Sequence, residues 1–342
     1  MHEARHRAPI PTAPEALHRF QFAIERAGGE DVWIKENPLP SHDAVLFLPR
    51  AYDAIEHAIL RSGREQGLRV AQINTSAGGS GMRSIQVTAY SGLDALCRWR
   101  MREVPRILRV AIVVDDLGQN MAAARDLLRL RSSLTFSVMP RLRFSRETAD
   151  AAHQAGIEVM LHLPMQPLAD SAPDVSPHEI KVGMGSREVG GIIATDLASV
   201  PYVAGVNNHM GSRATSDPRL MNEVMAALAA RHLFYIDSRT AASSVALEVA
   251  RRAGVPSFYR SVFLDDTRTI PYTLGQLRKL CRVAGKQGAA LAIGHPYPST
   301  IAALGQFLPG LERDDIQLVR VSALLSLQAA ARPAPSSPVR KL

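Results

Sequence analysis

Short apolar segments alternate with longer amphipathic ones from Arg109 onward, and this alternation constrains the fold more than any other feature. The apolar segments predict strands at residues 110–114, 134–139, 157–161, 202–206, 233–236, 257–263, 290–293 and 317–321. Helices are predicted between them at residues 121–130, 146–155, 186–199, 219–230, 245–253 and 274–286. Seven or eight such units are typical of a (β/α) barrel, complete or distorted, whereas an open doubly wound sheet is the alternative.

The chain is predicted to contain two folded regions between loose ends. Residues 106–328 form the barrel, and residues 15–105 form a small α/β domain in which we recognise no catalytic group. Residues 1–14 and 329–342 are rich in proline and serine and are expected to be disordered. In the small domain, helices are predicted at 16–27 and 52–66, and strands at 32–35, 44–48, 68–74 and 84–90.

The composition narrows the possible partners. Lysine and arginine exceed aspartate and glutamate by 40 to 32, so an anionic partner is possible. We nevertheless predict no nucleic-acid partner, because aromatic residues make up only 5% and no nucleic-acid-binding motif is present. The most basic segment, residues 98–102 with Arg106 and Arg109, is interpreted as a solvated helix end and linker.

The positions of the cysteines and of the apolar residues argue against a cysteine-based zinc protein and against a membrane-spanning protein. Cys97 and Cys281 are far apart and form no Cys-x-x-Cys motif, which excludes a cysteine zinc cluster and leaves a disulfide open. No apolar stretch approaches the roughly 18 residues of a membrane span, so we expect no transmembrane segment. The first residues lack the apolar core of a secretory signal. The oligomeric state is not indicated.

Polar residues follow directly after several of the predicted strands. Because all strands of a barrel end at one rim, such residues converge there even when they are far apart in sequence. Carboxylates and histidines at one rim could hold a divalent metal, and a mixed nitrogen and oxygen set favours zinc or a similar ion over magnesium or calcium. The strand-end residues are Asp115, Asp116, His162, Asn207, Asn208, His209, Asp237 and His295.

The acidic pair Asp115-Asp116 has a competing interpretation as the magnesium site of a phosphoacceptor receiver domain. In that class an aspartate ends the third strand, whereas here the third strand ends in His162. The strand–helix repeat also continues beyond the length of a receiver domain. Adjacent strand residues point to opposite faces, so both acids reach one cleft only if the chain bends, which Gly118 would ease.

Five segments together resemble the divergent polysaccharide deacetylase family, in matching order over roughly residues 107–326. They are residues 111–118 (AIVVDDLG), 159–165 (VMLHLPM), 206–213 (VNNHMGSR), 234–240 (FYIDSRT) and 293–298 (IGHPYP). The resemblance implies a distorted (β/α) barrel related to the metal-dependent carbohydrate deacetylases. It implies an acetylated carbohydrate as the substrate, and it extends to no part of residues 1–105.

The resemblance also implies roles for individual residues. By position in the family motif, Asp115 is the catalytic base, Asp116 is a metal ligand and His295 is the general acid. His162 follows the Gly-x-Glu pattern of the first histidine ligand. Deacetylases typically carry a second histidine four residues on, but this chain has Gln166 there. We infer that His209 replaces it.

Four further residues are candidates for the same site. Asp237 is expected to orient a histidine or complete the metal site, and Asn208 to contact substrate. Arg213 and Arg239 are expected to meet an anionic group of the substrate. Asp237, Arg213 and Arg239 are each equally compatible with a structural role.

The sequence therefore predicts a metal-dependent hydrolase, with zinc as the expected ion, that removes acetyl groups from a carbohydrate. The missing second histidine leaves open a catalytically silent carbohydrate-binding protein on the same barrel, and phosphate-ester hydrolysis is a third possibility. The resemblance suggests the periplasm or cell envelope, although the sequence as given shows no signal peptide.

Overall fold

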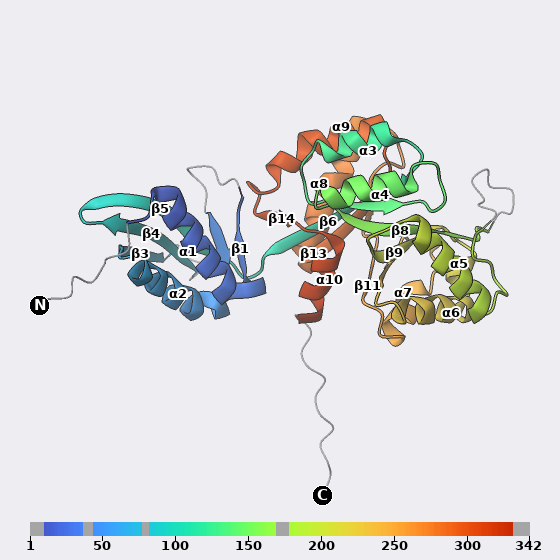
Figure 1. Ribbon diagram of the computed structural model, residues 1–342, viewed down its shortest axis with the longest axis horizontal. Helices are drawn as coiled ribbons and strands as arrows, with labels where there is room; N and C mark the ends of the chain where they lie inside the picture. The colour runs from blue at the N-terminus through green and yellow to red at the C-terminus, as the bar shows by residue number, and fades with distance from the viewer. Residues whose placement is uncertain (1–9, 37–43, 77–81, 169–177, 331–342) are drawn as a thin grey trace, which may run out of the picture. The chain divides into compact units, whose positions relative to one another are not determined.

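The computed structural model describes residues 10–36, 44–76, 82–168 and 178–330 (Figure 1). The chain divides into two compact units, the first comprising residues 1–108 with 310–317 and the second residues 109–309 with 318–342. Most of the predicted disordered ends lie outside the described residues. Where they are described, helix extends into them, because residues 13 and 14 belong to the first helix and residues 329 and 330 to the last.

The first unit is a five-stranded sheet with two helices. The sheet has the order β1-β2-β5-β4-β3, and the helices pack against each other and against its strands. Ile85, Val87 and Ala89 alternate into the core and are almost completely buried, as the sequence pattern predicts. The elements are α1 (Ala13–Gly28), β1 (Val32–Ile34), β2 (Val45–Phe47), α2 (Tyr52–Glu65), β3 (Arg69–Ser76), β4 (Arg83–Ser91) and β5 (Asp94–Glu103).

Strand β5 corrects the interpretation of the basic segment. Residues 98–102 do not form a helix end and linker but lie within this strand. Trp99 and Met101 are buried in the core, whereas the arginines between them point to the other face, and Arg102 forms an ion pair with Asp315. The period of two was present in the sequence, but the arginines obscured it.

The second unit contains a curled sheet in which all pairings along the main strand order are parallel. Its strands follow the order β11-β10-β9-β8-β7-β6-β13-β12, and no pairing joins β11 to β12 among the described residues, so the barrel stays open. This confirms the predicted distorted (β/α) barrel. The strands are β6 (Leu108–Leu117), β7 (Thr135–Val138), β8 (Glu158–Met165), β9 (Val203–Met210), β10 (Phe234–Asp237), β11 (Ser257–Tyr259), β12 (Val262–Phe263) and β13 (Ala289–Gly294).

Two predicted strands differ from the observed elements. The run 257–263 is split into β11 and β12, which lie at opposite ends of the strand order. The run 317–321 is also shorter than predicted, since β14 covers Ile316–Leu318 and a helix begins at Val321. In both places polar residues mark the break, since Arg260 and Ser261 separate β11 from β12 and Arg320 separates β14 from the helix, but the apolar residues on either side predict one continuous strand.

Helices surround the curled sheet and contact each other in the series α5–α6–α7 and α4–α3–α9–α8 (Figure 1). Residues 110–114 of β6 are at most 1% exposed, as expected for a strand covered on both faces. Among the described residues, no helix is both long and apolar enough to span a membrane. The helices are α3 (Met121–Leu128), α4 (Ser145–Gln154), α5 (Ser186–Ser199), α6 (Pro218–Ala229), α7 (Ala246–Arg252), α8 (Ile270–Gln287), α9 (Pro298–Phe307) and α10 (Val321–Ala330).

Candidate active site

One pocket at the carboxyl rim of the parallel sheet gathers residues from strands β6, β8 and β9 and from the segment after β13. Its volume is about 480 Å³. Six residues were expected to perform catalysis or to hold the metal, and all of them except Asp237 line this pocket. The five that line it are Asp115, Asp116, His162, His209 and His295.

A bend at the end of β6 brings both acids into this pocket. The pairing of β6 with β7 shifts register between Val114 and Leu117, and Asp116 has a φ of 57°, in the left-handed region. A register break of this kind turns consecutive side chains away from strict alternation. The bend was expected at Gly118, which does have a φ of 109°, but it already begins at Asp116.

Three side-chain atoms from different strands form a nearly equilateral triangle. His162 Nε2 and His209 Nδ1 are 3.1 Å apart, and Asp116 Oδ1 is 3.2 Å from the first and 3.1 Å from the second. Ligands about 2.1 Å from one ion, at angles between tetrahedral and octahedral, stand about 3.0–3.4 Å apart. Asp116 Oδ1 is also buried without a hydrogen-bond partner among the described residues. The three atoms therefore fit a divalent metal ion.

The charges in the pocket favour a cation at this position. Burial disfavours the charged form of His162, but the charges of Asp115 and Asp116 outweigh it and raise the pKa of His162 to about 9. Burial likewise opposes ionisation of Asp116, but its interactions with His162 and His209 hold the pKa of that carboxyl well below its usual range. Positive charge between these side chains is therefore stabilised, whether protons or a metal ion supply it.

Asn207 connects the proposed base to the proposed ligands. Its Nδ2 donates to both carboxylate oxygens of Asp115, at 2.9 and 3.1 Å. Its Oδ1 lies 2.9 Å from His162 Nδ1 and accepts a hydrogen bond of 2.6 Å from Ser137 Oγ. A proton on His162 Nδ1 leaves Nε2 unprotonated and able to bind a metal. Asn207 therefore orients both the proposed base, Asp115, and one proposed metal ligand, His162.

Asp265 holds the histidine on the opposite side of the pocket. The buried Asp265 carboxylate accepts hydrogen bonds from His295 Nδ1 at 2.9 Å, from His295 N at 2.6 Å and from Thr300 Oγ1 at 2.8 Å. Burial alone lowers the pKa of His295, but the bond to Asp265 and the charges of Asp115 and Asp116 outweigh it and raise that pKa. A protonated His295 is suited to donate a proton.

Two residues noted in the sequence lie apart from the donor triangle. Gln166, at the position of the usual second histidine, directs its Oε1 to the Val182 N–H at 3.1 Å. Arg213 donates its backbone N–H to the Gln166 carbonyl and does not line this pocket. His209, from the neighbouring strand β9, occupies the third corner of the triangle instead.

Asp237 and Asn208 have partners other than those expected. Within the described parts of the chain no histidine is hydrogen-bonded to Asp237; its carboxylate accepts from the Arg239 N–H at 2.8 Å and from Ser244 Oγ at 2.9 Å. Asn208 lines the pocket, but Tyr235 Oη and the Ser238 N–H both donate to its Oδ1 at 2.9 Å. Both side chains therefore order the loop after β10. Of the two arginines expected to contact an anionic group of the substrate, Arg239 lines the pocket and Arg213 does not.

Two residues that position this site were given no role from the sequence, although each left a signal. Asn207 was named among the strand-end residues, but only its two successors, Asn208 and His209, were assigned functions. Asp265 and Asp266 form a second acidic pair after an apolar run, like the pair at Asp115 and Asp116. Leu264 separates this pair from the predicted strand end at Phe263, so the residue directly after that strand is apolar and the pair was not grouped with the rim residues.

Fold and site together define an open (β/α) barrel with a candidate metal centre at its carboxyl rim. The sequence profile of the divergent polysaccharide deacetylase family matches residues 112–325. The chain belongs to this family, as its motifs predict.

Relatives and a solved structure extend this likeness. The chain is 36% identical over 227 residues to an uncharacterized protein of Haemophilus influenzae, covering 66% of this chain and 80% of that one. It is 37% identical over 218 residues to the uncharacterized protein YibQ of Escherichia coli, covering 64% and 67%. A crystal structure of an uncharacterized protein from Agrobacterium tumefaciens matches with a TM-score of 0.62 at 25% identity, covering 64% of this chain and 89% of that one.

Proposed function

We propose that this protein is a metal-dependent hydrolase that removes acetyl groups from a carbohydrate. The observation that carries the proposal is the triangle of Asp116, His162 and His209 donor atoms, with Asp115 and His295 beside it in the same pocket. Family membership supports the substrate class. Two imidazole nitrogens and one carboxylate oxygen favour zinc as the ion.

The residues around the triangle divide the chemistry between them. A divalent ion held there would supply Lewis acidity toward the acetyl carbonyl and make water more acidic. Asp115, with Oδ2 3.7 Å from His162 Nε2, accepts the proton of the attacking water. His295 has its Nδ1 bonded to Asp265 and its Nε2 3.7 Å from Asp116 Oδ2, so Nε2 can donate a proton to the departing oxygen or nitrogen.

Metal content and acetate release test this proposal on the same purified protein. Wild type should bind one zinc per chain and release acetate from acetylated oligosaccharides. Asp115→Asn should keep the metal but lose at least about 100-fold in turnover, because it removes the general base. His162→Ala and His209→Ala should lose both. His153→Ala is the matched control, since that exposed histidine on α4 stacks on Tyr202 outside the pocket.

The outcomes separate the proposal from its competitors. Wild-type turnover by Asp115→Asn would show that the base is assigned wrongly. A protein that binds glycan but holds no zinc and releases no acetate would be the silent binding protein. Turnover of phosphate esters alone would indicate a phosphoesterase. The silent alternative is motivated by Gln166, whereas the position of His209 in the triangle supports the hydrolase.

A further inference from the structure

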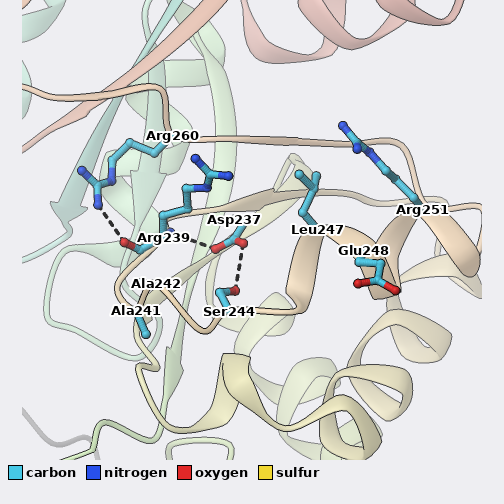
Figure 2. Close-up of a pocket in the computed structure, with 9 residues that line it drawn as sticks. All are labelled: Asp237, Arg239, Ala241, Ala242, Ser244, Leu247, Glu248, Arg251 and Arg260. Atoms are coloured by element: carbon cyan, nitrogen blue, oxygen red, sulfur yellow. Dashed lines mark hydrogen bonds between the residues drawn. The ribbon is translucent and has the colours of Figure 1, made fainter.

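A second pocket adjoins the candidate active site on the side of the loop after β10. Its volume is about 680 Å³, and Arg239 and Arg260 line both pockets. The two pockets therefore meet at these two arginines. Figure 2 shows the residues that line this second pocket, which are Asp237, Arg239, Ala241, Ala242, Ser244, Leu247, Glu248, Arg251 and Arg260.

Positive charge dominates the side chains that this second pocket offers to a ligand. Three arginines line it, and Figure 2 shows Arg239 and Arg251 extending in the same direction, away from Ala241 and Ala242. Of the two acids, Asp237 is 2% exposed and already accepts two hydrogen bonds from its own loop. Glu248 is highly exposed, with Arg252 3.8 Å away.

Two of the arginines are held in place by the protein itself. Arg260 donates from Nε to the Ser238 carbonyl at 2.6 Å and from Nη2 to the Arg239 carbonyl at 2.8 Å. Arg239 has a φ of 51°, a conformation uncommon for a side chain of this size, and its guanidinium lies 4.0 Å from the centre of the Tyr259 ring. Such preorganised guanidinium groups recognise carboxylates with little further loss of entropy.

We propose that this second pocket binds a carboxylate on the sugar next to the acetylated one, so that the substrate is an acidic acetylated glycan. The inference rests on the proposed function for the position of the acetylated sugar. Guanidinium and carboxylate groups form paired, charge-assisted hydrogen bonds, which explains why arginines rather than lysines gather here. A neutral glycan would offer no anionic group to the guanidinium groups of Arg239 and Arg251.

Binding can be measured without turnover in the Asp115→Asn protein loaded with zinc. The probes are a tetrasaccharide of alternating N-acetylglucosamine and glucuronate and the same tetrasaccharide with its carboxyls reduced to alcohols. We expect titration calorimetry to show about 10-fold tighter binding of the acidic form, typical of a charge-assisted hydrogen bond. Adding Arg239→Gln or Arg251→Gln should reduce that ratio to within about threefold.

Arg219→Gln is the matched control, because it removes the same charge from an exposed position on the neighbouring helix α6, outside both pockets. It should leave the ratio at the value of its parent. Equal affinity for the two tetrasaccharides, or binding of neither, would overturn the inference.

Acetate release by the wild-type chain tests the proposed function separately. Acetate release without tighter binding of acidic glycans would support the proposed function and contradict carboxylate binding in the second pocket. Tighter binding of acidic glycans without any acetate release would support carboxylate binding and contradict the proposed function.

Discussion

Replacing Asn207 by alanine tests how the base and the metal ligands are held together. The change removes the hydrogen bonds from Asn207 Nδ2 to Asp115 and breaks the contact of its Oδ1 with His162 Nδ1. It also leaves Ser137 Oγ, now 2.6 Å from the amide oxygen, without that acceptor. Because Asn207 is fully buried, water does not readily take its place.

The size of the effect follows from these bonds. A hydrogen bond to a charged group contributes about 1.5–3 kcal/mol, and every 1.4 kcal/mol is about a factor of ten. Loss of the bonds to Asp115 should therefore lower kcat/KM by about 10- to 100-fold. Loss of the contact that orients His162 should lower zinc affinity by about 10- to 100-fold, the usual effect of removing an outer partner of a metal-binding histidine.

Competition with a chromogenic zinc chelator measures the affinity, and acetate release measures kcat/KM. Asn208→Ala is the matched control, because Asn208 is the buried neighbour whose bonds go to Met210, Tyr235 and Ser238. It should lower the free energy of unfolding by about 1–3 kcal/mol while zinc affinity changes less than about threefold. Wild-type zinc affinity and kcat/KM in Asn207→Ala would refute the reasoning.

Two further predictions concern stability. Burial raises the pKa of Asp196 more than its ion pair with Arg141 lowers it, so the folded protein binds this proton more tightly than the unfolded chain. The free energy of unfolding of wild type relative to Asp196→Asn should therefore decrease as the pH rises from 4 to 7 in urea titrations, and an increase would contradict the assignment. Tyr235→Phe removes the bond to Asn208 and should cost about 1 kcal/mol with an unchanged urea m-value; no change in the midpoint would contradict it.

Much of the barrel could be predicted because its signals are local. Apolar runs and amphipathic segments identified the core strands and most helices, including α5, whose observed bounds equal the predicted ones. The failures came where a local pattern had two explanations. Arginines obscured the alternation in β5, and the polar residues Arg260 and Ser261, which separate β11 from β12, fell within one predicted strand.

The same limit applies to the site. The rim residues were identified because parallel strands end at one edge, which needs only the strand positions. Their partners could not be identified in this way, since Asp265 reaches His295 from a different strand end and across 30 residues of sequence. Asp237 occupies an equivalent strand end, yet its carboxylate contacts its own loop.

The order of residues along the chain is enough to predict that carboxylates and histidines end the strands of a parallel barrel, because hydrophobic burial selects the strands and their direction selects the rim. Which of these side chains meet depends on how the strand ends pack in three dimensions. Gln166 directly follows β8 and His209 lies near the end of the adjacent strand β9, but Gln166 turns toward Val182 and His209 turns toward Asp116. The left-handed backbone at Asp116 completes the triangle, and such a bend depends on packing around the strand end rather than on residue type.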